Sequence, residues 1–310
     1  MKNILLLVLT LCLSNTASLF AQEKPIRVLT FNVRLSTAND GENAWSKRKS
    51  FLAEVITRFP DGNGPYDFVG TQETVLHPDA KFNQREYLAS KLSGYAHIGR
   101  SRNKTPDKGE AMILFWKTDS WSLDVGDNGT FWLSDTPDVP GSKSHGAAYP
   151  RCVTFGLFHE INKEGGKTGR RVYVYNTHFD HISEAARQHA ARVLLERIVA
   201  RKDQAAPVIL MGDFNSGEKS PAIRYLQGKE SELDGVTQKP PMALKDTFRA
   251  VNANATEVGT FNSFKAPGRA KIDFIFVSAP LKPLSSQIIR TQRDGKYPSD
   301  HFPVEAILSF

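Results

Sequence analysis

The amino-acid sequence predicts an α/β protein in which two β-sheets pack face to face and helices cover the outside. Eight apolar segments have strand character and four segments have helix character, so strands outnumber helices. The apolar runs are too continuous for strands with one face in water, which indicates sheets that are buried on both faces. Several strands end abruptly in Asn, Asp, Glu or His, a pattern typical of sheets that present a polar site at their ends.

The predicted strands begin directly after Pro25, where the missing N–H of proline does least harm. The first strand, residues 26–33 (IRVLTFNV), is β-branched and alternates in part. A short apolar strand over residues 66–71 ends at the polar pair Gln72-Glu73. Six further strands of the same kind are predicted at residues 111–116, 153–158, 172–176, 208–211, 272–277 and 304–308.

Helix signals occur at residues 45–59, 81–92, 184–202 and 220–226. In the first of these, four apolar residues fall on one face: Leu52, Val55, Ile56 and Phe59. Ser183 is a predicted N-cap for the third helix, and Pro221 stands in the first turn of the fourth. The Gly- and Pro-rich stretch at residues 134–150 is interpreted as a long connection within the domain and not as a linker between domains, because apolar strand signals resume directly after it.

The chain begins with an expected signal peptide, residues 1–21, which leaves residues 22–310 as a single domain. Lys2 precedes an apolar run of ten residues, Ile4 to Leu13, which is too short to span a bilayer. Small or polar residues then lead to Ala21, although Leu19 stands where a small side chain is preferred, so the exact cleavage site stays open. We therefore expect export to the periplasm or to the outside of the cell.

The composition favours a charge class of partner but does not identify the partner. The formal net charge is +7, and removal of the leader with Lys2 lowers it to +6, which favours anionic partners. Cys152 is then the one cysteine left, so the exported protein has no intramolecular disulfide. No later segment is apolar enough for a membrane helix, and neither a heptad repeat nor an apolar stripe indicates a partner chain. We expect a monomer without stable membrane association.

Six short polar motifs follow the predicted strands: Phe31-Asn32, Gln72-Glu73, Asn176-Thr177-His178-Phe179-Asp180-His181, Gly212-Asp213-Phe214-Asn215, Lys271-Ile272-Asp273 and Ser299-Asp300-His301. Each motif alone is more often a turn former or a helix cap. Together they supply hard oxygen ligands (Asn32, Glu73, Asp300) and two histidines (His178, His301). This is the inventory needed to hold Mg²⁺ and to hydrolyse a phosphoester.

The spacing of Asp213 and Asn215 has a physical reason. On an extended segment, residues i and i+2 point the same way, so carboxylate and amide would face one cleft while Phe214 points into the core. Other chemistries lack their motifs in this sequence. There is no Cys cluster or His-x-x-x-His helix for zinc, no Gly-x-Ser-x-Gly elbow for a serine hydrolase, and no Gly-rich nucleotide loop.

In identity and order these motifs resemble the endonuclease/exonuclease/phosphatase superfamily. This magnesium-dependent fold is shared by pancreatic-type deoxyribonucleases, apurinic endonucleases, inositol polyphosphate 5-phosphatases, neutral sphingomyelinases and nocturnin-like deadenylases. The resemblance runs from Phe31 to Pro303. It implies a four-layer α/β sandwich of two mainly antiparallel sheets flanked by helices, with the site at one edge and with Mg²⁺ or Mn²⁺ as cofactor.

The resemblance also implies a role for each site residue. It makes Glu73 the main metal ligand, with Asn32 beside it and Asp300 completing or neighbouring the metal site. His301 would stabilise the phosphoryl charge, with its imidazole oriented by Asp273.

Five more residues take roles from the same resemblance. Asp213 would position or deprotonate the attacking water, and Asn215 would hold it. His178 would face the leaving group, Glu110 would pair with that histidine, and Arg151 would reach the phosphate. For Glu110 and Arg151 a solvated charge at a strand end is the open alternative.

The remaining polar residues of the motifs have lesser roles. Alternation puts Asp180 on the side of His178, which favours a supporting role, and puts His181 on the other side, as a cap or in solvent. Histidines without partner motifs are interpreted as structural or surface residues: His77, His97, His145, His159 and His189.

Two substrate hypotheses stay open. A nuclease, acting on nucleic acid as partner, is favoured by the net charge and by a basic cluster before Glu110: Arg100, Arg102, Lys104 and Lys108. A solvated loop has the same composition. The alternative is a phosphatase or phosphodiesterase for an inositol phosphate, a sugar phosphate or a nucleotide, because aromatic residues are not interleaved with the basic ones. A lipid substrate of the sphingomyelinase kind would require an exposed apolar loop on the protein, and the sequence has no strong candidate for one.

Two stretches of sequence, residues 43–48 and 132–151, resemble an exported bacterial branch nearest the nocturnin and deadenylase group. A catalytically inactive binding module is disfavoured, because every core position of the motifs carries a competent residue.

Overall fold

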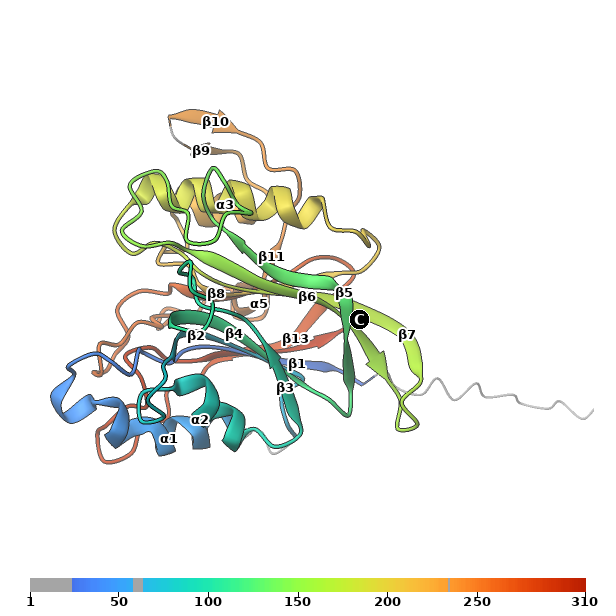
Figure 1. Cartoon of the computed structure of the whole chain (residues 1–310). Helices are drawn as coiled ribbons and strands as arrows, with labels where there is room; N and C mark the ends of the chain where they lie inside the picture. Colours follow the sequence, from blue (N-terminus) through green and yellow to red (C-terminus); the bar gives the residue numbers. More distant parts are fainter. Residues whose placement is uncertain (1–23, 58–63, 234) are drawn as a thin grey trace, which may run out of the picture.

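The structure is a computed structural model that describes residues 24–57, 64–233 and 235–310. The expected signal peptide therefore lies outside the described residues. Two six-stranded sheets lie against each other, and helices cover both outer faces, which makes four layers (Figure 1). The predicted α/β sandwich of two packed sheets is confirmed.

The first sheet has the strand order β13-β14-β1-β2-β4-β3. Its strands are β1 (Ile26–Asn32), β2 (Phe68–Leu76), β3 (Tyr95–Ile98), β4 (Gly109–Lys117), β13 (Lys282–Ile288) and β14 (Val304–Ser309). β1 and β2 are parallel, and the other neighbours are antiparallel.

The second sheet has the order β11-β12-β8-β7-β6-β5, with β7 and β8 as its parallel pair. Its strands are β5 (Trp121–Trp132), β6 (Cys152–Ile161), β7 (Lys167–His178), β8 (Val208–Asp213), β11 (Lys245–Asp246) and β12 (Asp273–Val277). A separate hairpin of β9 (Ser231–Leu233) and β10 (Val236–Gln238) extends beyond the helices that cover this sheet (Figure 1).

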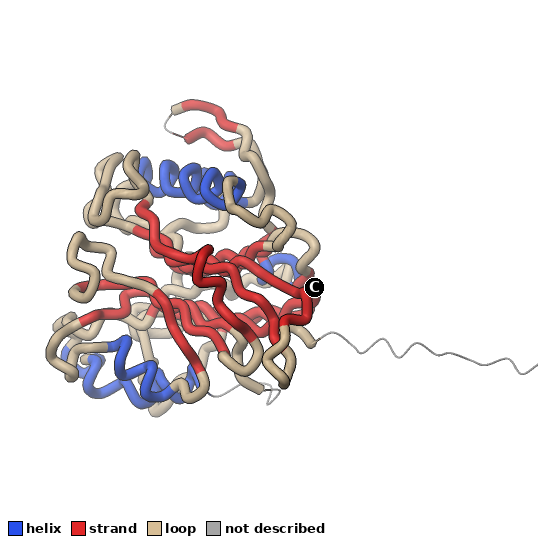
Figure 2. Tube along the Cα trace, turned by 45° about the vertical axis from the view of Figure 1, so that its right-hand side comes forward, coloured by secondary structure: helices blue, strands red, loops and turns tan. Residues whose placement is uncertain are grey.

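Helices α1 (Trp45–Thr57) and α2 (Gln84–Lys91) cover the first sheet, and α3 (Glu184–Val199) and α4 (Pro221–Leu226) cover the second (Figure 2). The short α5 (Thr247–Val251) contacts β12 and β13, and a 3₁₀ turn, Gly41–Asn43, precedes α1. The predicted cap is present, because the Ser183 hydroxyl accepts from the Ala186 N–H at 3.1 Å. Among the described residues, no helix is long and apolar enough to cross a membrane.

The continuous apolar strands are explained by burial on both faces. In β1, Val28 packs into the core between the two sheets, whereas Leu29 packs beneath α1 and α2. The core between the sheets joins strands that are distant in sequence, such as β1 through Val28, β8 through Ile209 and β12 through Ile275. This packing sets the two sheets in a fixed register and so positions their polar ends.

Several elements differ from the prediction. The strand predicted at residues 66–71 spans Phe68–Leu76, because pairing with β4 resumes after a register shift at residues 71–74. The helix predicted at residues 45–59 is described only to Thr57. The sequence did not predict β3, β5, β9, β10, β11, β13 or α5. Of these, β5 and β13 are edge strands: β5 has half-buried polar residues and glycines over most of its length, and β13 exposes Lys282, Ser285 and Gln287, so neither strand shows a continuous apolar pattern.

Candidate active site

The polar motifs meet at one edge of the two sheets. The carboxyl ends of β1, β2, β7 and β8 and the amino ends of β4, β6, β12 and β14 reach this edge together. Asp213 pairs in register with His178 of β7 on one side and with Asp273 of β12 on the other. Strand register alone therefore sets three of the predicted site residues next to one another.

A cavity of about 650 Å³ lies at this edge. Eight of the ten predicted site residues line it: Glu73, Glu110, Arg151, His178, Asp213, Asn215, Asp300 and His301. The other two, Asn32 and Asp273, are fully buried behind it and bond to residues that line it.

Glu73 stands on a distorted part of β2. Its φ is +58°, in the left-handed region that side-chain-bearing residues rarely adopt, and the β2–β4 register shifts at this point. One carboxylate oxygen accepts from the Leu35 N–H at 3.1 Å, and the other from the Asn32 amide at 3.1 Å. The bulge thus turns Glu73 out of the strand pattern and into the cavity.

Asn32 lies behind Glu73 and links it to Asp213. Its amide nitrogen donates to Glu73 and, at 3.0 Å, to Asp213, while its oxygen accepts from the Arg34 N–H at 3.0 Å. In this arrangement Asn32 holds two carboxylates in position, and its own oxygen is already satisfied. The metal-ligand role of Asn32 stays a prediction.

The loop that carries Asp300 is tied to the end of β1. Ser299 donates to the Asn32 carbonyl at 2.7 Å. The buried Arg48 guanidinium donates to the carbonyls of Val33 and Pro298 at 2.6 and 3.0 Å. These bonds bring Asp300 to the cavity beside Glu73, a connection between distant segments that no local pattern indicates.

His301 forms a buried pair with Asp273. Its Nδ1 lies 2.9 Å from the Asp273 carboxylate, and its Nε2 faces Asp213 at 3.8 Å. Burial alone would lower the pKa of His301, but the carboxylates of Asp273, Asp213 and Asp300 raise it well above its usual value. The imidazole is therefore held as a cation aimed into the cavity.

Asp213 is an ionised carboxylate in the middle of the site. Burial opposes its charge, yet His178 and His301 and the hydrogen bonds from Asn215 and Asn32 lower its pKa. Asn215 has a φ of +46°, so the segment is not extended as the spacing argument assumed. Even so, both side chains line the cavity, and Phe214 between them is fully buried as predicted.

His178 is oriented by groups on both ring nitrogens. Nδ1 lies 3.2 Å from Glu110, and Nε2 lies 3.0 Å from the Asn215 amide nitrogen. Glu110 also receives the Arg102 guanidinium at 2.6 Å. Burial opposes ionisation of Glu110, but Arg102, His178 and Arg151 lower its pKa to about 2. Glu110 is thus a buried, paired anion and not a solvated strand-end charge.

Arg151 is also buried rather than solvated. Its Nη2 lies 2.9 Å from His181 Nδ1, its Nη1 lies 3.7 Å from Glu110, and its Nε lies 3.5 Å from Asp180. Asp180 therefore supports Arg151, consistent with the predicted supporting role. His181 is exposed, as expected, but it also lines the cavity, because the chain leaves β7 at His178 and strand alternation no longer applies.

Sequence reasoning assigned no role at the cavity wall to Arg102, Tyr149 or His181. Arg102 was interpreted only as part of a basic cluster, and Tyr149 was not singled out. The Tyr149 and His181 rings stack with centroids 6.0 Å apart and planes 16° apart, and the Arg102 guanidinium lies 4.7 Å from the Tyr149 centroid. Tyr149 and His181 come from different loops, so only their meeting in space indicates a shared role.

The donor set fits a hard divalent cation. Burial and the nearby Glu73 raise the pKa of Asp300, which marks an excess of negative charge that a cation would relieve. Carboxylate oxygens are the ligands that Mg²⁺ and Mn²⁺ prefer. Asp213, Asp273 and His301 form another group of possible ligands, because one ligand atom of each lies within 4.8 Å of the others. In this group, however, His301 Nδ1 is already paired with Asp273.

Comparisons with known proteins agree with this geometry. The sequence model of the Endonuclease/Exonuclease/phosphatase family matches residues 29–301. A crystal structure of a family protein from Bacteroides vulgatus is 30% identical, with 93% of this chain and 99% of that chain covered and a TM-score of 0.76. A mannosyl-6-phosphatase from Bacteroides thetaiotaomicron is 30% identical, covers 92% of this chain and 100% of its own, and has a TM-score of 0.72.

A more distant structure shares the fold alone. The human nocturnin catalytic domain is 18% identical, with 93% of this chain and 96% of that chain covered and a TM-score of 0.67. Among curated proteins, none matches this chain significantly. The family match over most of the chain, together with the polar edge of the two sheets, means that this protein is a phosphoester hydrolase and belongs to the endonuclease/exonuclease/phosphatase family.

Proposed function

We propose that the enzyme removes phosphate from a small phosphorylated substrate, with a sugar phosphate as the substrate class, and that Mg²⁺ or Mn²⁺ is its metal. The observation that carries this proposal is the Tyr149–His181 wall with Arg102 and Arg151 beside it. An aromatic face accommodates the apolar face of a sugar ring, and the Arg151 guanidinium at the cavity wall can bind phosphate oxygens, while Arg102 lies against the Tyr149 ring and Glu110. Of the two substrate hypotheses, we therefore favour the small-molecule phosphatase over the nuclease.

The basic segment before Glu110 offers little support for a polymer track. Arg102 is buried against Glu110, and Arg100 lies over the Trp132 ring and donates to the Lys104 carbonyl at 3.0 Å. Of the four basic residues, only Arg102 and the exposed Lys108 line the cavity. A nucleic-acid backbone is bound by a row of exposed cations, and this segment leaves few of them free.

The similar proteins point in the same direction. The mannosyl-6-phosphatase is 30% identical over its whole length, whereas nocturnin, at 18% identity, has only the fold in common. A sugar-phosphate substrate therefore has the support of the relative that is more similar in sequence.

The proposed reaction uses the residues at the sheet edge in turn. Asp213, ionised and beside Asn215, takes a proton from the attacking water, and Asn215 holds that water. The cationic His301, kept in place by Asp273, stabilises the charge on the phosphoryl oxygens.

Four further residues complete the proposed site. His178, oriented by Glu110, faces the leaving group. Arg151 binds the phosphate from the cavity wall. Glu73 and Asp300 would hold the divalent cation, which when bound supplies a Lewis acid that polarises the phosphoryl group.

The test is a substrate panel with the mature protein in Mg²⁺ or Mn²⁺. Hexose 6-phosphates, inositol phosphates, a 2′,3′-cyclic nucleotide, single-stranded DNA, RNA and sphingomyelin are each incubated, and released phosphate and polymer length are measured. We expect phosphate from a hexose 6-phosphate with both nucleic acids intact. Shortened DNA or RNA without release from the sugar phosphates would overturn the proposal in favour of a nuclease.

Two controls connect this activity to the site. EDTA and the Glu73→Gln variant are both expected to abolish turnover, with Mg²⁺ or Mn²⁺ restoring it only after EDTA. Tyr149→Ala is expected to raise KM for the sugar phosphate by about 10-fold or more while kcat changes little, because it removes binding area and no reacting group. An unchanged KM in Tyr149→Ala would contradict the sugar-binding role of this wall.

We also propose export of the protein, on the pattern of residues 1–21 alone. The expected result is a mature N-terminus at or near Gln22 in the periplasmic or extracellular fraction, determined by N-terminal sequencing. Full-length protein in the cytosol would contradict export without bearing on the enzymatic proposal.

A further inference from the structure

Arg102 connects two parts of the active site that have different tasks. It lines the cavity, yet it is only 8% exposed. Its Nη1 lies 2.6 Å from Glu110 Oε1, and the same guanidinium lies over the Tyr149 ring, 4.7 Å from the ring centroid. Glu110 orients the histidine that faces the leaving group, whereas Tyr149 belongs to the proposed sugar-binding wall. One buried cation therefore contacts both parts.

The contact with Glu110 fixes the carboxylate that faces His178. Glu110 Oε1 lies 3.2 Å from His178 Nδ1 and 3.7 Å from Arg151 Nη1, so the bond from Arg102 is the shortest of the three. The main chains are bonded as well, because the Arg102 N–H donates to the Glu110 carbonyl at 2.9 Å. A hydrogen bond between two charged groups is shorter and stronger than a neutral one. Arg102 thus determines where the oxygen that faces His178 is held.

Arg102 itself belongs to a segment that is well anchored. Its carbonyl accepts from the indole N–H of Trp132 at 2.6 Å, and Trp132 is buried. The preceding residue, Ser101, is fully buried and forms a β-bridge with Ala111 of β4. A firm support of this kind is what a group that positions other side chains requires.

The contact with Tyr149 supports a side chain that is half exposed. Tyr149 is 50% exposed, and it stacks with His181, which is exposed as well. A guanidinium over the face of the ring adds the attraction between a cation and an aromatic ring. Because Arg102 is buried whereas both rings are exposed, Arg102 is the firmly held member of this group. We expect the Tyr149 ring to lose its fixed orientation when the guanidinium is removed.

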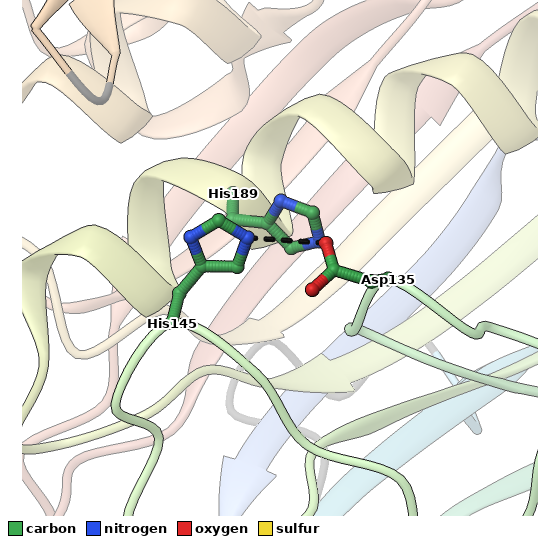
Figure 3. Close-up of side chains that lie close together, drawn as sticks. All are labelled: Asp135, His145 and His189. Carbon is green, nitrogen blue, oxygen red and sulfur yellow. Dashed lines mark hydrogen bonds and ion pairs between the residues drawn. The ribbon is translucent and has the colours of Figure 1, made fainter.

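The loop that carries this tyrosine is attached to α3 by separate contacts. Figure 3 shows Asp135 and His145 of the loop beside His189, which comes from the middle of the helix. The two histidine rings stack with centroids 4.0 Å apart, and His145 Nε2 lies 3.1 Å from Asp135 Oδ1. Ser183, the helix cap, donates to the His145 carbonyl at 2.7 Å. Loss of the Arg102 guanidinium should therefore release the tyrosine ring without releasing the loop.

We propose that Arg102 is a positioning residue that couples two parts of the site: it orients the leaving-group histidine through Glu110 and supports the sugar-binding wall through Tyr149. This role rests on the proposed function, in which His178 faces the leaving group and the wall receives the sugar. Arg102 acts through its two neighbours and on no reacting atom. Its loss should therefore lower kcat through Glu110 and raise KM through Tyr149.

The leaving group determines how strongly the reaction depends on His178. Water attacks phosphorus and gives a proton to Asp213, while the bond between phosphorus and the sugar oxygen breaks and its electron pair stays on that oxygen. The sugar oxygen takes up a proton from the protonated His178 ring. A 4-nitrophenyl ester instead leaves as a stable anion and needs no proton. A misoriented His178 should therefore slow the sugar phosphate far more than the 4-nitrophenyl ester.

The experiment compares Arg102→Gln with the unsubstituted protein on both kinds of ester in Mg²⁺. We expect kcat for a hexose 6-phosphate to fall by about 10²-fold or more and kcat for 4-nitrophenyl phosphate to fall by less than about 5-fold. KM for the sugar phosphate should rise by about 10-fold, as in Tyr149→Ala. A merely structural role would lower both kcat values together, so equal losses in a variant that is folded by circular dichroism would overturn the proposal.

Arg102→Lys separates the two contacts. Its ammonium group can still pair with Glu110, but it lacks the flat guanidinium that lies over the Tyr149 ring. We expect kcat to stay within about 5-fold of the unsubstituted value while KM rises as in Tyr149→Ala. The variant keeps the buried charge, so it remains informative if Arg102→Gln fails to fold, and an unchanged KM would overturn the support of the ring.

Arg100→Gln is the matched control. Arg100 precedes Arg102 by two residues, lies over the Trp132 ring at 5.3 Å and donates to the Lys104 carbonyl at 3.0 Å, but it does not line the cavity. Neither kcat nor KM should change in this variant for either ester. A kcat loss in Arg100→Gln that is confined to the sugar phosphate would contradict a role specific to Arg102.

The test of Arg102 stays valid if the proposed substrate class is wrong. An unsubstituted protein that cleaves nucleic acid and releases no phosphate from sugars would overturn the proposed function. The comparison then uses the dinucleotide TpT and the 4-nitrophenyl ester of thymidine 5′-phosphate. A larger kcat loss for TpT in Arg102→Gln would support the role in orienting His178, and equal losses would overturn it.

Discussion

The residues of the site differ in how they acquire their charge. Asp213 is held ionised by two histidines and by hydrogen bonds, whereas Asp300 is buried beside Glu73 and has a raised pKa. His301 is held cationic by carboxylates on several sides. Neighbouring groups thus lower the pKa of one aspartate and raise the pKa of another. Acid–base chemistry at one site requires such a difference.

Asp273→Asn tests the orientation of His301. The variant removes a carboxylate that raises the pKa of His301, so its cationic form is lost at lower pH. We expect kcat to fall by about 10²–10⁴ with KM little changed, as for a misoriented acid–base group. The alkaline limb of the kcat/KM profile should move down by about one pH unit or more.

The pH profile distinguishes positioning from structural damage in this variant. Asp203→Asn, which changes a surface carboxylate paired with Arg171, should leave the profile in place. An alkaline limb that stays fixed in Asp273→Asn, with folding intact, would contradict the assigned role of the pair.

Glu110→Gln tests the buried anion between Arg102 and His178. The pKa of Glu110 is lowered to about 2 in the folded protein, so its contribution to stability is present above its unfolded value near 4.5 and is lost as pH falls toward 2. We expect the free energy of unfolding to drop by on the order of 2–3 kcal/mol at pH 7. The difference should shrink steadily between pH 4.5 and 2, measured by denaturant unfolding.

The control for this prediction is another carboxylate in an ion pair. Glu160 pairs with Arg170 at 3.0 Å and does not line the cavity. Glu160→Gln should leave kcat unchanged and should not cause a stability loss of the size expected for Glu110→Gln. A stability difference for Glu110→Gln that persists unchanged at low pH would argue against the ionised pair.

At the scale of elements, the end of β8 determines where Asp213 points. Gly212 has a φ of +152°, and a Cβ built there would lie 2.1 Å from the Thr177 carbonyl oxygen of β7. β7 and β8 are the parallel pair of the second sheet and carry His178 and Asp213 at their ends. The absence of a side chain at residue 212 therefore lets the two strands stay close at the site.

Gly212→Ala should disturb stability and activity together. Because the clash is with backbone, the strands must separate, and we expect a loss of about 1–3 kcal/mol in the free energy of unfolding. kcat should fall as Asp213 moves relative to His178. Gly217→Ala is the matched control, because a Cβ there meets nothing within 4 Å. Equal stability and activity in the two variants would contradict this account.

At the scale of the whole molecule, a polar connection joins the two sheets near the site. Gln72 Nε2 on β2 donates to Asn176 Oδ1 on β7 at 2.6 Å, and Asn176 donates to the carbonyls of Thr71 and Ile113 at 3.0 and 2.9 Å. Both amides are fully buried. The apolar core between the sheets surrounds this connection, so neither sheet is expected to unfold alone.

Asn176→Leu should destabilise both sheets in one transition. The variant leaves buried polar groups without partners, at about 1–3 kcal/mol for each unsatisfied group. Far-UV circular dichroism and tryptophan fluorescence should still report one coincident transition at lower denaturant. Asn254→Leu, the same change at an exposed position, should cost less than about 0.5 kcal/mol. Separate transitions for the two probes would contradict a single folding unit.

The sequence by itself determined the features that depend on local pattern. Continuous apolar strands indicated sheets buried on both faces, Ser183 indicated the start of a helix, and the order of the polar motifs indicated the family and ten candidate site residues. Eight of these line one cavity and two lie directly behind it. Such inferences succeed because side-chain period, capping and strand ends are properties of neighbouring residues.

Only the tertiary structure determined the features that depend on contacts between segments distant in the sequence. Packing that no local window contains produces the left-handed backbone at Glu73 and Asn215 and the burial of Arg102 and Arg151. It also places the exposed His181 at the cavity wall. The same holds for Asp135, His145 and His189, which are far apart in the chain and adjacent in space. The edge strand β5 was not predicted for a related reason, because its pairing with β6 outweighs a sequence that is polar and rich in glycine in its middle.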